Sequence, residues 1–486
     1  MRRRDFVATT GAAWAALATP PAVLRVSRRR GVDPARLQAV LDGAAKALGV
    51  VGAQLAVFDG TTLHECATGM ANRERGLAAS TDTLFQIGST TKVFNASMIM
   101  ALVDRGVLDL DRPVRSYITD FALAEPEWAA RITLRQLLSM SAGLDNGSYS
   151  DHGRGDDALD RYVAAMVSIP NIFEPGTGFG YSNAGSNVAG LAAQRATRRN
   201  WDALLRDHLL RPLRLERSAT FPEELLFHSV SLGYRLGQQG APPSRVPVWG
   251  LPRSMSPAGG TLCCSAGDLA RLGRLFLDDG VAPDGTRVLS AAAVRVMHTP
   301  QVTLPARLTA ERWCCGPYWK RWGGVELYGH SGTNSGGSSM LLWSPAKRMA
   351  IATIANVPNQ GYPLANRIFD AVLPEMFGIA KPKQATPETV TRASFDPARY
   401  LGRFEAHGSI LIFTAVDGKL MVQSTSPAAR NEPVATELIP LGDDRFLPAD
   451  PAMGGNRGWD VAFWGRDGAG RATHFLNGVF ATRRTG

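Results

Sequence analysis

Segments with the pattern of β-strands lie near both ends of residues 33–378, and a long helix-rich stretch separates them. AQLAVFDGTTLHECATGMA (53–71) predicts two strands joined by a turn at Asp59-Gly60. Far downstream, three more strands are predicted at ELYGHSG (326–332), SSMLLWS (338–344) and MAIATIAN (349–356). The chain therefore predicts a mixed α/β fold in which a helical region is inserted into the sequence of an antiparallel sheet.

Helices are predicted on both sides of these strands. Asp33-Pro34 begins the first, because Asp can cap a helix and Pro fits its first position, and Leu37, Val40, Leu41 and Leu48 fall on one face. PLANRIFDAVL (363–373) predicts a helix after the last strand. The inserted region, about 101–320, carries helical patterns such as TLRQLLSM, AGDLARLGRLFLDD and AAAVRVM.

A second domain is predicted at the C-terminal end. Residues 379–394 are polar, contain prolines and lack periodicity, which is typical of a linker. Residues 395–486 hold short alternating segments, such as SILIFTAV and WDVAFWG, separated by turns such as Asp417-Gly418. This pattern predicts a small antiparallel sheet or barrel.

Composition excludes some classes of protein. The chain has 486 residues, of which 45% are hydrophobic, so it can bury a large core. Its net charge of +10 comes mainly from arginine, without a dense basic block interleaved with aromatics after the N-terminus, and we expect no nucleic-acid partner. No later stretch reaches the roughly 18 apolar residues of a membrane span, so we expect no integral membrane protein.

The first residues resemble an export signal. MRRRDFVATTGAAWAALA (1–18) has a charged start, a short apolar run and an A-x-A site, and its paired arginines are of the twin-arginine type. A disordered basic tail is the alternative. The signal predicts a bacterial protein that is exported, already folded, to the periplasm or the medium.

Export would permit disulfides among the five cysteines. One hypothesis is a bridge between the pairs Cys263-Cys264 and Cys314-Cys315, and the alternative, which includes Cys66, is buried free thiols. The adjacent pairs lack the C-x-x-C spacing of a zinc site, and we expect no metal and no cofactor.

Residues GSTTK (88–92) place Ser89 three residues before Lys92, at the start of a predicted buried helix, VFNASMIMALV (93–103). Serine is a weak nucleophile unless a base takes its proton. Burial and the positive end of the helix dipole both lower the pKa of a lysine here, which favours a base. Ser89 could also cap the helix, and the two roles are compatible.

The S-x-x-K spacing is weak evidence alone, because SPAK (344–347) also matches it, in a predicted hairpin turn. Two further motifs supply what acyl transfer needs, a proton shuttle and donors for an oxyanion. Tyr181-Ser182-Asn183 is the only Y-x-N, and His330-Ser331-Gly332, at a glycine-rich turn after a strand, is the only H-x-G. Tyr181 as an ordinary loop tyrosine and His330 as a structural histidine are the alternatives.

Together these motifs resemble the serine β-lactamase and penicillin-binding-protein superfamily, in its class C-like branch of D-alanyl-D-alanine carboxypeptidases, β-lactamases and esterases. The resemblance spans about 36–378. It rests on the following segments: FQIGSTTKVFNASMIMALVDRGVLDLDRPV, ITLRQLLSMSAGL, EPGTGFGYSNAGSNVAG, SPAGGTLCCSAGDLARL and GHSGTNSGG. The end of the chain, from RYLGRFE (399–405), resembles the lipocalin-like β-barrels appended to some of these hydrolases.

The resemblance implies an active site between an α/β domain and a mostly helical one, and a small-molecule or peptide acyl substrate. It implies the following roles: Ser89 as the acylated nucleophile, Lys92 as its base or as the group that orients it, Tyr181 as the proton shuttle, Asn183, His330 and Gly332 as substrate-binding residues, and the N–H groups of Ser89 and Thr333 as the oxyanion hole.

The chain departs from the family in one motif, since His330-Ser331-Gly332 stands where β-lactamases usually carry K-T-G. A lysine there is a cation that holds a substrate carboxylate, whereas a histidine is mostly neutral near pH 7. Strong β-lactam turnover is therefore not expected, and an ester or peptide substrate is. A penicillin-binding or sensor protein without turnover, or an acyltransferase, are alternatives. Another is an α/β-hydrolase that uses Ser331 in the near-match GHSGT to G-x-S-x-G.

Overall fold

The computed structural model describes residues 33–237, 241–307, 310–406, 408–425, 435–450, 453 and 459–486. The predicted export signal at 1–18 lies outside them. Among the described helices, none combines the length and the apolar character that a membrane span requires.

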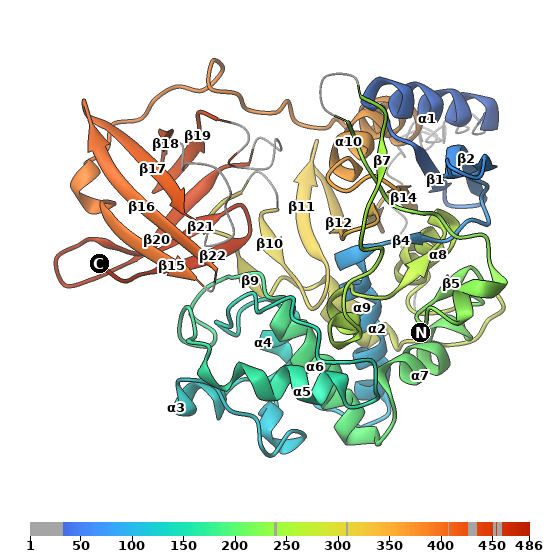
Figure 1. The fold of residues 1–486 in the computed structure, drawn as a ribbon, viewed down its shortest axis with the longest axis horizontal. Helices are drawn as coiled ribbons and strands as arrows, with labels where there is room; N and C mark the ends of the chain where they lie inside the picture. The colour runs from blue at the N-terminus through green and yellow to red at the C-terminus, as the bar shows by residue number, and fades with distance from the viewer. Residues whose placement is uncertain are drawn as a thin grey trace, which may run out of the picture. The chain divides into compact units, whose positions relative to one another are not determined.

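The larger domain is built on a nine-stranded sheet whose strands come from both of its ends, as predicted (Figure 1). The N-terminal hairpin consists of β1 (Gly52–Phe58) and β2 (Leu63–Asn72), and β1 also pairs antiparallel with β14 (Met349–Ala355). β13 (Ser338–Ser344) and β12 (Val325–Thr333) continue the sheet. The SPAK residues end β13 and form its turn to β14, also as predicted.

Short strands extend the sheet at its two edges. They are β3 (Leu77–Ala78) at one edge and β11 (Tyr318–Trp322), β10 (Arg312–Trp313) and β9 (Val302–Thr303) at the other. The helical region was expected at about 101–320. β9 and β10 lie within this range, and β11 crosses its end. Two-residue strands are too short to show the alternation that identifies a strand in a sequence.

Helices cover both faces of the sheet. α1 (Pro34–Leu48) and α10 (Gly361–Val372) pack against one face, and α8 (Ala266–Leu277) packs against the other. Asp33 caps α1 as predicted, because its side chain accepts a hydrogen bond from the N–H of Ala35. Side chains alternate between the two cores: Leu55 joins the cluster with α1, whereas Phe58 joins the cluster with α8.

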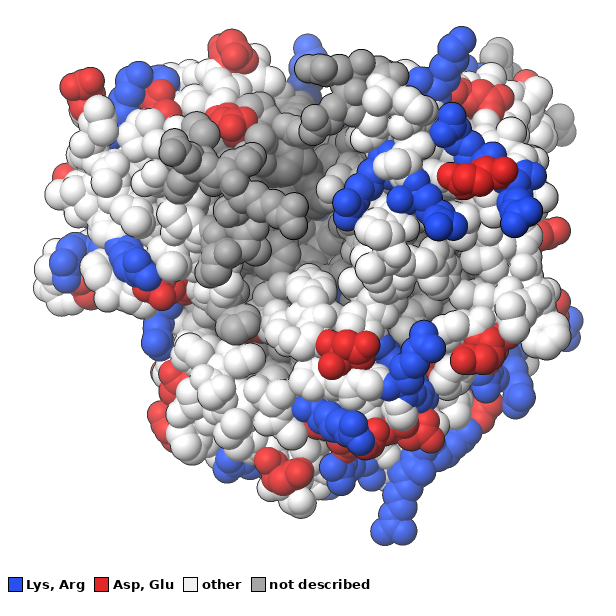
Figure 2. Space-filling view, viewed as in Figure 1, with Lys and Arg blue, Asp and Glu red and all other residues white. Residues whose placement is uncertain are grey.

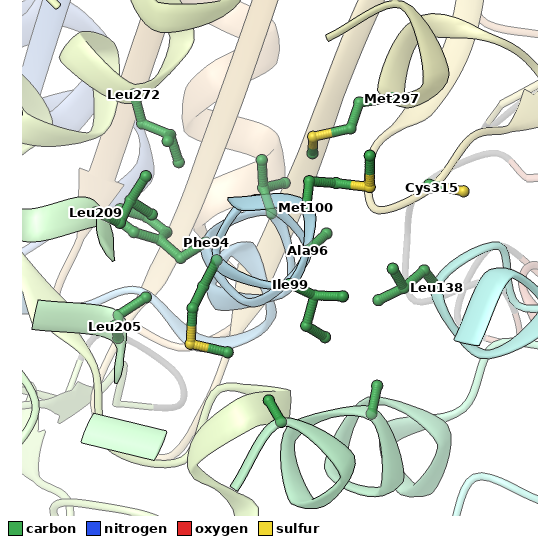
Figure 3. Close-up of a cluster of buried hydrophobic side chains, with 14 of the residues drawn as sticks. Phe94, Ala96, Ile99, Met100, Leu138, Leu205, Leu209, Leu272, Met297 and Cys315 are labelled. Atoms are coloured by element: carbon green, nitrogen blue, oxygen red, sulfur yellow. The ribbon is translucent and has the colours of Figure 1, made fainter. Parts of the chain in front are cut away.

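The remaining helices form the helical region together with α2 (Thr91–Asp104). They are α3 (Pro126–Ala129), α4 (Leu134–Leu138), α5 (Ala158–Ala164), α6 (Asn183–Thr197), α7 (Trp201–Leu205) and α9 (Ala291–His298). Every residue of α2 from Thr91 to Leu102 is buried, as the apolar sequence predicted. Figure 3 shows why: apolar side chains from several elements, among them Leu138, Leu209 and Met297, surround it. α2 is therefore a rigid base for the residues that precede it.

Small sheets complete this domain. β8 (Cys263–Cys264) pairs with β4 (Phe85–Gln86) and β5 (Ser218–Ala219), and β6 (Tyr234–Arg235) pairs with β7 (Ser244–Arg245). All five cysteines are buried and free. The hypothesis of a bridge between the two cysteine pairs is therefore wrong, and each pair instead fills apolar space, where burial raises the thiol pKa values.

The C-terminal segment forms a closed antiparallel barrel of eight strands. They are β15 (Gly402–Ala406), β16 (Ser409–Val416), β17 (Lys419–Thr425), β18 (Ala435–Gly442), β19 (Arg445–Pro448), β20 (Val461–Arg466), β21 (Ala472–Asn477) and β22 (Phe480–Arg484). Closure of β15 onto β22 leaves no open sheet edge. Its interior is filled by aromatic rings, since Phe404, Phe413 and Phe463 contact one another in mutual edge-to-face geometry.

The surface mixes charges of both signs. On the face in Figure 2, basic side chains gather at the upper right, where Figure 1 draws β7, while acidic and basic side chains alternate along the lower part. Many arginines are paired with carboxylates; Arg135, for example, contacts Asp111 at 2.6 Å.

Candidate active site

Ser89 lies in a single 3-10 turn, η1 (Gly88–Thr90), directly before α2. The N-cap position of α2 belongs to Thr90, and no side chain makes the capping hydrogen bond. The expectation that Ser89 could cap the helix is therefore wrong, because the extra turn moves it one residue away from that position. The Ser89 hydroxyl instead lies within hydrogen-bonding distance of Lys92.

Lys92 projects from the first turn of α2 into the protein and is only 2% exposed. Its Nζ lies 3.2 Å from the Ser89 Oγ, 2.6 Å from the Asn183 Oδ1 and 2.6 Å from the Ala258 carbonyl oxygen. Burial holds the pKa of Lys92 well below its usual range, because the ammonium loses its hydration. The nearest partners are neutral, so the free amine is favoured.

The three contacts orient the lone pair of that amine. A neutral amine has two N–H groups and one lone pair. The two shortest contacts are to oxygens that only accept hydrogen bonds, Asn183 Oδ1 and the Ala258 carbonyl, so both N–H groups are used there. In the free amine the lone pair is then left for the third partner, so the Ser89 hydroxyl, 3.2 Å away, can donate to it. This is the geometry in which an amine can take the proton from serine.

Tyr181 lies beside this pair. Lys92 Nζ is 4.8 Å from the centre of the Tyr181 ring. Burial raises the pKa of Tyr181, and the nearby Ser89 hydroxyl opposes that shift, although the phenol makes no hydrogen bond of ordinary geometry to protein. The loop is fixed by Ser182, which caps α6 by accepting from the Gly185 N–H and donates to the Asp145 carbonyl oxygen at 2.6 Å.

Asn183 begins α6, and both ends of its side-chain amide are occupied. Its Oδ1 accepts from Lys92, and its Nδ2 donates to the Tyr149 hydroxyl at 3.0 Å. Asn183 therefore contacts the lysine directly, in addition to the substrate contact that the resemblance implied. Tyr149 is a site residue that the sequence did not reveal, because a lone tyrosine in the loop NGSYS carries no pattern.

His330 lies on β12 and is 2% exposed. Its Nδ1 lies 2.6 Å from the Ser331 carbonyl oxygen, and since a carbonyl only accepts, Nδ1 carries the proton. Burial lowers the pKa of His330 to about 3, against the effect of that carbonyl. The imidazole is thus neutral at physiological pH, and its buried Nε2 has no protein partner. Nε2 can accept a hydrogen bond from a bound molecule.

Gly332 and Thr333 bring the end of β12 against the nucleophile turn. A methyl group on Gly332 would overlap the carbonyl oxygen of Ile87, and one on Gly88 would lie 2.6 Å from the backbone nitrogen of Thr333. The two backbones touch because both positions are glycine. The N–H groups of Ser89 and Thr333 thus belong to adjoining segments, which is the arrangement an oxyanion hole needs.

Ser331 has a different environment from a hydrolase nucleophile. It lies within β12, paired with Met340 of β13, and the chain continues through a turn into β13. An α/β-hydrolase nucleophile sits between a strand and a helix. The fold therefore rules out the alternative based on GHSGT.

Trp313, on β10, is a second residue that the sequence did not reveal. Its ring packs edge-on against Tyr181 and against His330, with centres 5.8 Å and 5.5 Å apart. In the described part of the chain, three buried polar atoms of these touching rings lack a protein partner: the Trp313 Nε1, the Tyr181 hydroxyl and the His330 Nε2. Buried polar groups are usually paired, so such a cluster marks a place where a polar ligand can bind.

The assembled site can perform nucleophilic acyl transfer. A serine hydroxyl faces a buried amine whose pKa is lowered, a phenol stands beside both, and the N–H groups of Ser89 and Thr333 lie on adjoining backbone segments. This is the chemistry of the serine hydrolases.

Comparison with known proteins identifies the family. Residues 37–372 match the family model described as Beta-lactamase, and the chain belongs to that family. It is 38% identical over 362 residues to penicillin-binding protein 4 of Amycolatopsis lactamdurans, covering 74% of this chain and 94% of that one. It is also 36% identical over 179 residues to esterase EstB of Burkholderia gladioli, covering 34% and 45%.

The fold is shared with solved structures across both domains. The alignment with the crystal structure of SurE covers 93% of this chain and 99% of the SurE chain, with a TM-score of 0.77 and 28% identity. The structure of SurE with D-Leu covers 94% and 100%, with a TM-score of 0.73 and 29% identity.

Proposed function

We propose that the protein is a serine hydrolase that cleaves an ester or amide through an acyl-enzyme on Ser89. The observation that carries the proposal is the environment of Lys92: a buried amine, 3.2 Å from the Ser89 hydroxyl, whose N–H groups are both used by other acceptors. The lone pair of such an amine can accept the proton of the Ser89 hydroxyl.

The steps follow from that arrangement. The Ser89 oxygen attacks the substrate carbonyl carbon while its proton moves to Lys92, and the N–H groups of Ser89 and Thr333 hold the oxyanion. The bond to the leaving group then breaks, and the proton reaches the leaving oxygen or nitrogen through the Tyr181 hydroxyl. Water attacks the acyl-serine in the reverse sequence and releases the acid. An amine or alcohol in place of water would make the reaction an acyl transfer.

The substrate class is inferred from His330. A neutral imidazole with a free acceptor at Nε2 suits an N–H or O–H group of a substrate, and it provides no positive charge for a carboxylate. A small-molecule or peptide ester or amide therefore fits better than a β-lactam. The similar structure of SurE was solved with D-Leu, which further supports a D-configured residue in the substrate.

Penicillin binding without turnover is the second candidate. It is favoured by the similarity to penicillin-binding protein 4. In that case a penicillin would acylate Ser89 in a single burst and stay attached. Under either candidate, the signal-like residues 1–18 lead us to propose that the protein is exported to the periplasm or the medium.

The test is turnover of matched substrates by wild type and Ser89→Ala. p-Nitrophenyl esters of acylated D-Leu and L-Leu, a D-Ala-D-Ala peptide and a penicillin form the panel. We expect Ser89-dependent hydrolysis of the esters, faster for the D-isomer. A burst with penicillin and no turnover of any ester would favour the second candidate, and activity that survives in Ser89→Ala would refute both.

A further inference from the structure

The hairpin of β21 and β22 in the C-terminal barrel reaches the catalytic tyrosine. Its two-residue turn is Gly478-Val479, between the paired residues Asn477 and Phe480. The Val479 carbonyl oxygen accepts a hydrogen bond of 2.9 Å from the backbone N–H of Tyr181. The barrel is thus bonded to the Y-x-N loop itself.

Further contacts fix the position of this hairpin. The His474 Nε2 lies 3.1 Å from the Ile172 carbonyl oxygen, so the imidazole donates to the segment that leads into the tyrosine loop. A methyl group on Gly180 would lie 3.0 Å from the Ala481 Cβ, so β22 and the loop are already in close contact. Leu476 and Ala481 belong to the same buried cluster as Phe179 and Tyr181. The hairpin is packed in place, and its turn has little freedom to move.

Phe480 is the residue that this packing presents to the site. Five barrel phenylalanines are buried, namely Phe404, Phe413, Phe446, Phe463 and Phe475, whereas Phe480 is 44% exposed. Its ring meets Tyr181 edge-on, with centres 5.7 Å apart and planes at 87°. Trp313 contacts the same tyrosine ring at 5.8 Å. A half-exposed aromatic ring beside a catalytic phenol is an apolar surface that a substrate can cover.

The side of the substrate that meets Phe480 follows from the role of Tyr181. In the proposed mechanism, the Tyr181 hydroxyl gives its proton to the leaving group, so the leaving group lies next to this ring while the acyl group is bonded to Ser89. We propose that Phe480, supplied by the barrel, forms the wall of the leaving-group subsite and selects substrates whose leaving alcohol or amine is apolar and bulky. This inference rests on the proposed function and assigns a specificity role to the C-terminal domain.

Phe480 should affect only one of the two kinetic steps, acylation of Ser89 and hydrolysis of the acyl-enzyme. The leaving group is present during acylation and absent from the acyl-enzyme, so Phe480 should affect the rate of acylation and leave hydrolysis of the acyl-enzyme unchanged. Loss of an apolar contact in a binding pocket changes kcat/KM by roughly tenfold to a hundredfold.

The experiment compares Phe480→Ala, Phe480→Leu and a matched control, Phe227→Ala, with wild type. Phe227 ends the 3-10 turn η5 (Glu224–Phe227) of the larger domain and is 88% exposed. Benzyl and methyl esters of one acylated amino acid are the substrates, and a second acyl group is tested with the same two alcohols. Melting temperatures of all variants report on folding.

We expect Phe480→Ala to lower kcat/KM for the benzyl esters by roughly tenfold or more, with the methyl esters nearly unchanged for both acyl groups. Phe480→Leu should recover most of the loss, and Phe227→Ala should resemble wild type. The proposal is overturned if the ratio of benzyl to methyl ester stays constant, or if it follows the acyl group. Absence of Ser89-dependent turnover in wild type would instead contradict the proposed function.

Discussion

Asn183→Asp tests whether the free amine of Lys92 is the working base. The substitution replaces a neutral oxygen with a carboxylate, at a position where Oδ1 lies 2.6 Å from Nζ. An opposite charge at about 4 Å stabilises the ammonium by about 4 kcal/mol in a protein-like dielectric. At about 1.4 kcal/mol for each factor of ten, Lys92 should hold its proton roughly a thousandfold more tightly, and its pKa should rise.

The raised pKa should lower the activity of Asn183→Asp at low and neutral pH. Lys92 must be unprotonated to take the serine proton, so activity is lost as the pH falls through its pKa. A raised pKa moves that acid limb to higher pH, and activity at a fixed pH below the new pKa falls roughly tenfold per unit. The assay is kcat/KM for a p-nitrophenyl ester between pH 5 and 10.

Asn183→Leu is the matched control at the same position. Like Asp, it cannot donate to the Tyr149 hydroxyl, but it also removes the hydrogen bond from Lys92 and adds no charge, so it should lower the rate without moving the acid limb upward. If Asn183→Asp keeps the acid limb of wild type, or if both variants shift it equally, the free amine is not the group that titrates.

Two further predictions concern β12. Gly332→Ala should lower the free energy of unfolding by about 3 kcal/mol, measured by urea denaturation, because the new methyl group overlaps the Ile87 carbonyl oxygen and neither backbone can move away; a variant of unchanged stability would show that β12 and η1 are not in contact. His330→Lys should raise the rate of acylation by penicillin roughly tenfold or more, measured by intact mass, because the ammonium adds a charge-assisted hydrogen bond to the drug carboxylate. An unchanged rate would show that residue 330 does not determine how well penicillin reacts.

The sequence predicted the parts of the fold that local chemistry determines. The Asp33 cap, the two strands β1 and β2 joined at Asp59-Gly60 and the uniformly apolar α2 each depend on neighbouring residues, and each is confirmed. The two-residue strands β9 and β10 were not predictable, because their pairing is decided by the sheet edge that they join. Burial of the two cysteine pairs as free thiols likewise depends on contacts between distant segments.

The candidate site shows the same division. The motifs around Ser89, Tyr181 and His330 could be found because each is a short pattern, and the fold brings them together. Tyr149, Trp313 and Phe480 carry no pattern, since each reaches the site from a separate loop or strand. Which nitrogen of His330 carries the proton also needed the structure, because it depends on the contact of Nδ1 with one carbonyl oxygen.

The central claim is that Lys92 activates Ser89, and labelling with a fluorophosphonate tests it most directly. The reagent phosphonylates an activated serine, and peptide mapping by mass spectrometry identifies the site. We predict one adduct, on Ser89, that forms quickly in wild type and is nearly abolished in Lys92→Ala, while circular dichroism shows both proteins folded. An adduct on Ser331, or equal labelling of Ser89 with and without Lys92, would contradict the account.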